Sequence, residues 1–131
     1  MNYLEEAIKI FSKDNFATDA LGAEILDAGK RYAKCRVKLT DIHKNAMGGV
    51  MGGVPYTLAD FTFAIASNLD NLPTVTLSST ISYIGACKGE YLISEAKCIK
   101  DGRSICTFEI SIKDELENQV ALIVMNGFHK V

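Results

Sequence analysis

The sequence predicts an α+β protein in which an antiparallel β-sheet curves around one long buried helix at about residues 53–68. Residues 53–68 are apolar on nearly every side at helical spacing, which is typical of a helix enclosed by other elements. From residue 74 onward, strand-like runs follow one another with turns between them. Consecutive strands of this kind favour an antiparallel sheet, and one hydrophobic helix is best buried within its curve. All 131 residues are expected to form a single domain.

One short helix and two strands are expected before the buried helix. Residues 1–16 predict an amphipathic helix whose apolar face is formed by Leu4, Ala7, Ile8 and Phe11. A weak strand follows at about Ala20–Asp27, and Gly29 ends it. Residues 31–39 alternate between apolar and mostly basic side chains, which indicates a half-buried strand. Its apolar face consists of Ala33, Cys35, Val37 and Leu39.

The rest of the chain is predicted to contain a loop, the buried helix and four strands. Residues 40–52 form a glycine-rich loop, and Pro55 then lies in the first turn of the helix, where proline is tolerated. The strands are predicted at residues 74–83, 89–100, 103–113 and 119–128. The last of them is apolar on both faces, as in an interior strand of a sheet.

Composition and charge exclude several classes of protein. Apolar residues make up 48% of the chain and charged residues 23%, with a formal net charge of −2, as in ordinary globular proteins. Lysine and arginine are spread along the chain, so no nucleic-acid partner is expected. The most apolar run, Gly52–Ser67, is too short to cross a bilayer and contains Asp60, so no membrane partner is expected.

The cysteines and the N-terminal residues indicate a cytoplasmic protein without a bound metal. No two cysteines form a Cys-x-x-Cys pair, so we expect reduced, buried thiols at Cys35, Cys87, Cys98 and Cys106. His43 and His129 do not have the spacing of a metal-ligand pair, and His43 is expected to lie exposed in its loop. Residues 1–16 do not have the layout of a signal peptide.

Asp60 is the one acidic residue in the predicted buried helix. A lone carboxylate in so apolar a segment is costly unless it is paired or functional. Two interpretations are open: Asp60 caps or bridges a neighbouring element, or it acts as a general base or nucleophile in a dry pocket. Gly52 and Gly53 favour the second, because they leave backbone N–H groups unblocked at the positive end of the helix dipole. Such groups suit an oxyanion or a polarised carbonyl, although a tight turn alone would also explain the glycines.

The spacing of Gly52 and Asp60 limits how they can act together. The two residues are eight positions apart, which corresponds to about 12 Å along a helix axis. Both groups would have to approach one reacting carbonyl to within roughly 3 Å. If both are catalytic, Gly52 of one subunit must meet Asp60 of another, which predicts a two-fold dimer with two shared sites.

Residues 43–60, with the sequence HKNAMGGVMGGVPYTLAD, resemble the active-site segment of hotdog-fold acyl-CoA thioesterases. These enzymes belong to the 4-hydroxybenzoyl-CoA thioesterase superfamily, and the phenylacetate-degradation type is the most similar subgroup. Its motif is H-x-N-x-x-G-x-x-H-G-G, followed by a helix that carries Leu-x-Asp. Residues 74–90 and 99–121 are also similar to the strands of this family, so the resemblance extends from about residue 15 to the C-terminus. It implies the hotdog fold, a curved sheet around one helix.

The resemblance also implies a role for each matching residue. Asp60 would activate water or attack the thioester carbonyl, and the Gly52 N–H would polarise that carbonyl. Asn45 would help to hold the thioester or the attacking water, and Thr76 would orient the water. The family shares its sites across a homodimer, and two dimers often form a homotetramer. No cofactor is implied, since coenzyme A is part of the substrate.

Met51 departs from the family motif, which has histidine at this position. Methionine makes no strong hydrogen bond, so it cannot brace the loop as histidine does, but it suits the wall of an apolar acyl tunnel. Met51, Gly53 and Tyr56 are therefore assigned to substrate binding. Phe61 and Phe63 either line the acyl pocket or pack in the core.

Cations near the mouth of the pocket would be needed to bind the phosphates of coenzyme A. Lys88 and Arg103 are the assigned candidates, with Lys100 beside them, because all three lie at predicted strand ends or turns. A solvated rim would equally explain these side chains.

The function predicted from the sequence is hydrolysis of an acyl-CoA thioester to a free acid and coenzyme A. Two alternatives remain. A non-catalytic acyl-CoA-binding protein of the same fold is favoured by Met51. An acyl-thioester hydratase or dehydratase would use a histidine on the buried helix, and residues 53–68 contain none.

Overall fold

Six antiparallel strands curve around one central helix in the structure, a computed structural model that describes residues 1–130. The chain begins with α1 (Tyr3–Phe11), the π-helical turn η1 (Phe16–Leu21), β1 (Ala23–Gly29), β2 (Tyr32–Lys38) and the 3-10 turn η2 (Asp41–His43). It continues with α2 (Gly53–Asn68), β3 (Thr74–Tyr83), β4 (Tyr91–Asp101), β5 (Ile105–Asp114) and β6 (Gln119–His129).

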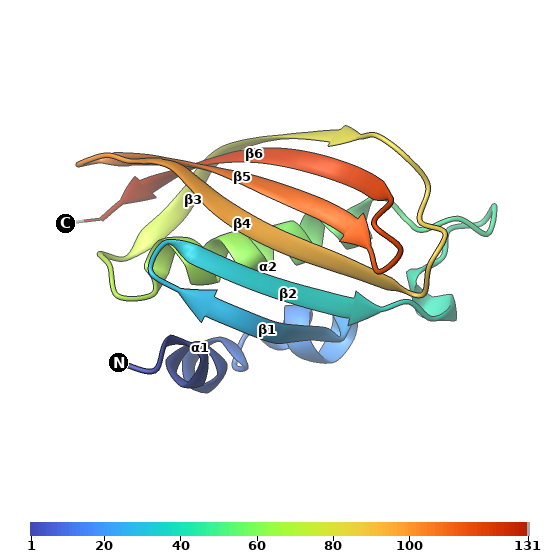
Figure 1. Ribbon diagram of the computed structural model, residues 1–131, viewed down its shortest axis with the longest axis horizontal. Helices are drawn as coiled ribbons and strands as arrows, with labels where there is room; N and C mark the ends of the chain where they lie inside the picture. The colour runs from blue at the N-terminus through green and yellow to red at the C-terminus, as the bar shows by residue number, and fades with distance from the viewer. Residues whose placement is uncertain (131) are drawn as a thin grey trace.

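The strands follow the order β1-β2-β4-β5-β6-β3 across the sheet, and every neighbouring pair is antiparallel. The chain closes the β1–β2 hairpin first and then crosses over with α2, which places β3 at the far edge (Figure 1). α2 lies against the concave face, mainly over β2, β4 and β5. The predicted fold class, a curved antiparallel sheet around a buried helix at residues 53–68, is confirmed.

The core consists of apolar side chains from α2 and from the inward positions of the strands. Phe63 of α2 meets Phe108 of β5 edge to face, with ring centroids 5.5 Å apart. A polar contact fixes the same helix to the sheet, since the Ser94 hydroxyl donates to Thr62 Oγ1 over 2.7 Å. Both hydroxyl groups are fully buried and paired, so they orient α2 on the sheet. Phe63 is buried in this core, whereas Phe61, also buried, reaches the wall of the cavity that Asp60 borders.

The N-terminal part of the chain differs from its prediction in two places. The weak strand expected from Ala20 begins at Ala23, because residues 16–21 form η1. Gly22 ends η1 with φ of +89°, a left-handed conformation that favours glycine, and the strand can start only after it. On α1, Ala7 and Phe11 are buried as predicted, but Ile8 is 46% exposed.

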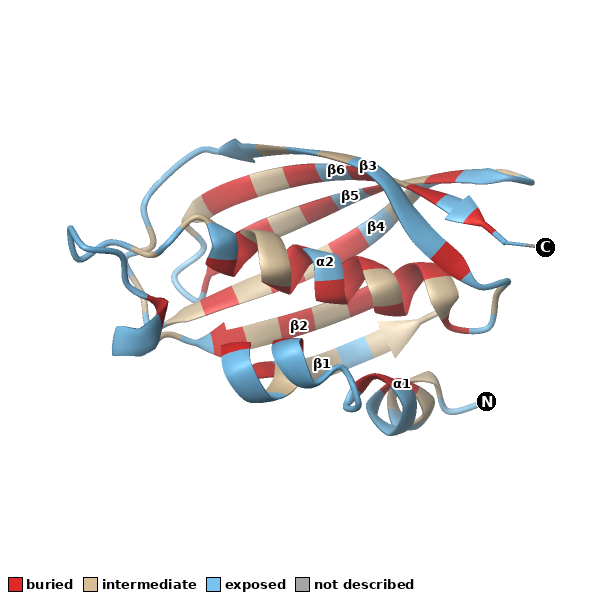
Figure 2. Cartoon of the chain, turned by 180° about the vertical axis from the view of Figure 1, so that it is seen from behind, coloured by how far each residue is buried: buried red, intermediate tan, exposed pale blue. Residues whose placement is uncertain are grey.

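Two neighbouring regions of the chain lack a covering layer. Along α2, the stripe formed by Gly53, Thr57, Asp60 and Ala64 is exposed or half-buried, while the rest of the helix is largely covered (Figure 2). Strand β3 pairs with β6 on one side only and borders no other strand of residues 1–130. Its Val75 and Leu77 side chains are 42% and 60% exposed. Together they form an apolar, unpaired flank beside the one acidic residue of α2.

Candidate active site

Asp60 lies at the middle of the uncovered stripe of α2, with its carboxylate facing the start of β3. In the single chain it is exposed rather than enclosed, and the Thr76 hydroxyl donates a long hydrogen bond of 3.4 Å to Asp60 Oδ1. Partial loss of hydration raises the pKa of Asp60 above its ordinary value, opposed by the Thr76 hydrogen bond and assisted by the charge of Asp14. The carboxylate is therefore a stronger base than a fully hydrated aspartate.

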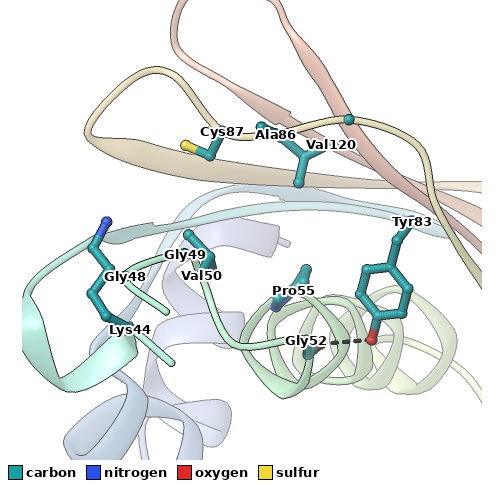
Figure 3. A pocket seen from close by; sticks show the side chains of 11 residues that line it. Lys44, Gly48, Gly49, Val50, Gly52, Pro55, Tyr83, Ala86, Cys87 and Val120 are labelled. Carbon is teal, nitrogen blue, oxygen red and sulfur yellow. Dashed lines mark hydrogen bonds between the residues drawn. The ribbon is translucent and has the colours of Figure 1, made fainter. Parts of the chain in front are cut away.

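Gly52 is the residue immediately before α2, and of its two backbone groups only the carbonyl oxygen has a hydrogen-bond partner. The Tyr83 hydroxyl donates to the Gly52 carbonyl oxygen over 2.7 Å (Figure 3). A side chain on Gly52 would approach Tyr83 Oη to 3.1 Å, so the close contact favours glycine here. The Gly52 N–H makes no hydrogen bond within residues 1–130 and lies at the positive end of α2. The Gly52 N–H is thus a free hydrogen-bond donor, and the Tyr83 hydrogen bond to the carbonyl oxygen of the same residue holds it in place.

A cavity of about 350 Å³ opens beside Gly52. Its walls come from the glycine-rich loop, the start of α2, the end of β3 with the segment after it, and the start of β6. They include Lys44, Gly49, Tyr83, Cys87 and Val120 (Figure 3). Asp60 does not line this cavity. It borders a second one, of about 320 Å³, on the other side of α2 together with Asp14 and Phe16. The chain therefore keeps Gly52 and Asp60 apart, as the helical spacing predicts.

The glycine-rich loop is organised by Asn45 and His43. Asn45 Oδ1 accepts the N–H groups of Met47 and Gly49 at 2.9 and 3.0 Å, so this oxygen shapes the loop. The prediction that His43 is an exposed loop residue is wrong, because its side chain is only 4% exposed. Its Nδ1 accepts the Thr40 N–H at 2.9 Å, and its Nε2 donates to the Leu21 carbonyl oxygen at 2.7 Å. This ring joins the loop to the end of η1.

The remaining predicted site residues are dispersed. Met51 and Gly53 are exposed on either side of Gly52, and Tyr56 contacts Ser79 of β3 through a 2.7 Å hydrogen bond between their hydroxyl groups. Lys88 precedes β4 and Arg103 follows it. Because β4 has 11 residues, the two cations are separated by about 35 Å along the strand and cannot bind the same phosphate within one chain.

Asp114 holds the segment that carries Lys88. Its buried carboxylate accepts the N–H groups of Lys88, Gly89, Leu116 and Asn118, and also the Asn118 side-chain amide. Burial alone would raise the pKa of Asp114, but these hydrogen bonds outweigh it and hold the pKa well below its ordinary value. One carboxylate thus anchors both the turn before β6 and the loop beside the Gly52 cavity.

Asp101, Cys106 and His129 form a cluster at the opposite end of α2, with potential ligand atoms within 4.8 Å of one another. His129 bonds Asp101 through Nε2 and Thr74 through Nδ1, both at 2.7 Å. Arg31 donates to the same Asp101 carboxylate at 2.6 Å. Because these polar groups are already paired, the cluster is a hydrogen-bonded network that joins the ends of β3, β4 and β6.

Tyr83, His43 and Asp114 shape the site, although no pattern in the sequence predicts a role for them there. Their partners lie 31, 22 and about 25 residues away in the chain, so no local pattern reveals the contacts.

All four cysteines are free thiols as expected, although Cys87 and Cys98 are only half-buried. Within residues 1–130, no helix is both long and apolar enough to cross a membrane.

An antiparallel sheet curved around one long central helix is the hotdog fold. The sequence model of the Thioesterase superfamily matches residues 47–121, more than half of the chain. The chain belongs to this superfamily, as its resemblance predicted.

Relatives and solved structures agree with this assignment. Acyl-coenzyme A thioesterase 13 of Homo sapiens is 27% identical over 130 residues, covering 96% of this chain and 91% of that protein. The Escherichia coli PaaI protein from the phenylacetic acid degradation operon superimposes with a TM-score of 0.90 at 22% identity, covering 98% and 94% of the two chains. A hypothetical thioesterase protein of Streptococcus pneumoniae, solved with coenzyme A, gives 0.84 at 24% identity over 94% and 96%. At these identities, the two structures establish the fold.

Proposed function

We propose that the protein is an acyl-CoA thioesterase that hydrolyses an acyl thioester to a free acid and coenzyme A. The observation that carries this proposal is the position of Asp60, a carboxylate of raised pKa on the uncovered stripe of α2. The Thr76 hydroxyl beside it is suited to orient a water molecule, as the family resemblance implies. The names of the relatives, among them acyl-coenzyme A thioesterase 13, support the same reaction.

The proposed mechanism needs a base and an electrophile. In one route Asp60 removes a proton from water, and the resulting hydroxide attacks the carbonyl carbon; in the other Asp60 attacks that carbon itself, and water then hydrolyses the mixed anhydride and regenerates the carboxylate. In both routes the Gly52 N–H stabilises the negative charge that develops on the carbonyl oxygen. The thiolate of coenzyme A then leaves and takes up a proton. A carboxylate and an amide dipole supply both roles, so we propose that the reaction requires no metal or other cofactor.

A complete site would require two subunits. Gly52 and Asp60 border different cavities of one chain, and the uncovered stripe of α2 lies beside the unpaired edge of β3. We propose that a second copy covers this flank, bringing its Gly52 and Asn45 to Asp60 and Thr76 of the first. A homodimer is the smallest assembly with this property, and pairing of dimers into a tetramer is compatible with it.

The coenzyme A portion is proposed to enter through the cavity beside Gly52, where Lys44 lines the wall and Lys88 lies in the adjoining loop. Arg103 lies at the other end of β4, so in this scheme it would meet the phosphates only from the partner subunit. A cytoplasmic location is proposed as well, which the four free thiols support.

The test is release of free thiol from short, medium, long and aromatic acyl-CoAs by the wild-type protein and by Asp60→Asn. Loss of a catalytic base typically costs 10²- to 10⁴-fold, so we expect kcat to fall about a hundredfold or more. Asp19→Asn is the matched control, because Asp19 is an exposed aspartate on η1 outside the cavities near Asp60.

The result that would overturn the proposal is equal turnover by Asp60→Asn and Asp19→Asn. If the wild-type protein binds acyl-CoAs but releases no thiol from any of them, the non-catalytic acyl-CoA-binding alternative replaces the enzyme. Met51, where the family has histidine, is the feature that favours this alternative.

A further inference from the structure

The backbone at Gly52 and Gly53, where α2 starts, lacks the usual restraints of a helix N-terminus. Neither residue has a side chain, so the backbone there is free to adopt many conformations. Gly52 occupies the N-cap position without a side-chain hydrogen bond, and the first turn of α2 carries no acidic residue. A donor that stabilises charge in a transition state must be fixed in direction, so another part of the chain has to hold this backbone.

Tyr83 supplies that restraint from the end of β3. Its hydroxyl group donates to the Gly52 carbonyl oxygen over 2.7 Å, and within residues 1–130 no other side chain hydrogen-bonds Gly52 or Gly53. The ring also packs against Gly52, since a Cβ atom there would be 3.3 Å from Tyr83 Cζ. Figure 3 shows the ring pointing from its strand toward Gly52. One hydrogen bond and one close contact therefore act on the same glycine.

The backbone of Tyr83 is itself fixed by the sheet. Tyr83 is the last residue of β3 and pairs with β6. Directly after it, the N–H groups of Ile84 and Gly85 both donate to the Val120 carbonyl oxygen, at 2.8 and 3.2 Å. The Tyr83 side chain is 57% exposed, so it contributes little to the core. Its specific contact is with Gly52, which indicates a role at the start of α2 rather than in packing.

We propose that Tyr83 is a positioning residue for the thioesterase reaction, because it holds the Gly52 carbonyl group and thereby sets the direction of the Gly52 N–H. Only the torsion angles φ and ψ separate these two groups, so a restraint on one restricts the other. Tyr83 does not need to touch the reacting atoms in this role. The inference rests on the proposed function and deepens it.

Strand β3 would then serve two sites at once. Near its start, Thr76 donates to Asp60, and at its end Tyr83 donates to Gly52. Residues 76 and 83 are about 23 Å apart along the strand. In the proposed dimer, Gly52 and Asp60 of one chain belong to different sites. A single strand thus aligns the carboxylate of one site and the N–H donor of the other.

The kinetic test compares Tyr83→Phe, which removes the hydroxyl group and keeps the ring, with Tyr32→Phe. Tyr32 is the matched control because its hydroxyl group also makes a short hydrogen bond, to Glu95 at 2.6 Å, and Tyr32 borders neither the cavity beside Gly52 nor the one beside Asp60. A misplaced reacting group can cost about a hundredfold in rate. Because the ring remains, we expect kcat of Tyr83→Phe to fall about tenfold while KM changes less than about twofold.

A second measurement, independent of turnover, is the NMR order parameter of the Gly52 N–H bond. We expect it to fall in Tyr83→Phe from the rigid value of about 0.85 toward the flexible range below about 0.6, and to stay unchanged in Tyr32→Phe. If the wild-type protein releases no thiol, the proposed function fails, while loss of order at Gly52 still supports the restraint by Tyr83.

Three results would overturn the inference: a rigid Gly52 in Tyr83→Phe, equal kcat values for Tyr83→Phe and Tyr32→Phe, or a loss that lies in KM alone. The last of these would make Tyr83 a substrate-binding residue. Thermal melting of both variants verifies that they are folded.

Discussion

Asp60 is partly desolvated and yet weakly hydrogen-bonded, a combination that does not suit a carboxylate with a purely structural role. Its surroundings remove part of its hydration, which disfavours the charged form, yet only the Thr76 hydroxyl compensates with a hydrogen bond, and that bond is long. Asp114 shows the opposite arrangement, because five hydrogen bonds stabilise its charge. A carboxylate whose negative charge is stabilised so weakly is better suited to accept a proton than to hold the fold together.

The pH dependence of activity follows from this difference. The proposed reaction requires ionised Asp60, and the raised pKa means that the carboxylate is protonated at a higher pH than an ordinary aspartate. Activity is thus expected to be full above the raised pKa and to fall as the pH decreases through it. The acid limb of the kcat/KM profile should lie above the ordinary aspartate range and should vanish from the residual activity of Asp60→Asn. An acid limb that survives in Asp60→Asn would assign it to another group.

At the scale of the secondary-structure elements, Gly127 determines how closely β6 can lie under α2. A Cβ atom at this position would be 2.8 Å from Phe63 Cζ and from Thr74 Cγ2, and 2.9 Å from Cys106 Sγ. Three elements, α2, β3 and β5, therefore meet at the backbone of β6 where only hydrogen fits.

We expect Gly127→Ala to destabilise the protein by about 1–3 kcal/mol, the usual cost of overpacking a core. Gly29→Ala is the control, because a Cβ atom there would make only ordinary contacts of 3.8–3.9 Å with Tyr32. Denaturant unfolding of the two variants provides the comparison. Equal stability of both would show that the core around Gly127 relaxes freely.

Elements with a strong local pattern were predictable from the sequence. The bounds of α2 agree with the prediction because Pro55 fixes its first turn and apolar residues continue to its end. By contrast, the strand predicted at about Ala20–Asp27 overlaps the end of η1, a π-helical turn whose Leu21 carbonyl is held by a histidine 22 residues away. Contacts of this kind depend on the assembled fold. Asp60 stood out in the sequence as a lone charge, whereas its pairing with Thr76 was indicated only by the family resemblance.

The whole molecule presents one flank on which a second copy would complete the site. β3 has an unpaired edge and exposed Val75 and Leu77, and α2 exposes the stripe around Asp60 beside it. Native proteins rarely leave a long apolar edge strand uncovered. If the sites are shared, each one combines Gly52 of one subunit with Asp60 of the other.

Mixing two inactive variants tests this arrangement. Gly52→Pro removes the N–H group, and its backbone φ of −57° is compatible with proline. The two variants, Gly52→Pro and Asp60→Asn, are unfolded together in equal amounts and refolded. Each heterodimer that forms then has one intact site out of two. Random pairing then restores about a quarter of the wild-type activity. No recovery, with heterodimers demonstrated by mass spectrometry, would mean that each chain carries its own complete site.

Asp114 has a consequence for how the molecule responds to acid. Since the pKa of Asp114 is lowered in the folded state, its contribution to stability is present above the unfolded-state value and is lost as the pH falls toward the folded-state value. Protonation would weaken five hydrogen bonds at once, in the turn before β6 and in the loop at residues 88–89. Acid would therefore release the rim of the cavity beside Gly52, the proposed entrance for coenzyme A, before it unfolds the sheet. None of the five hydrogen bonds reaches α2, so this local opening would leave the central helix in place.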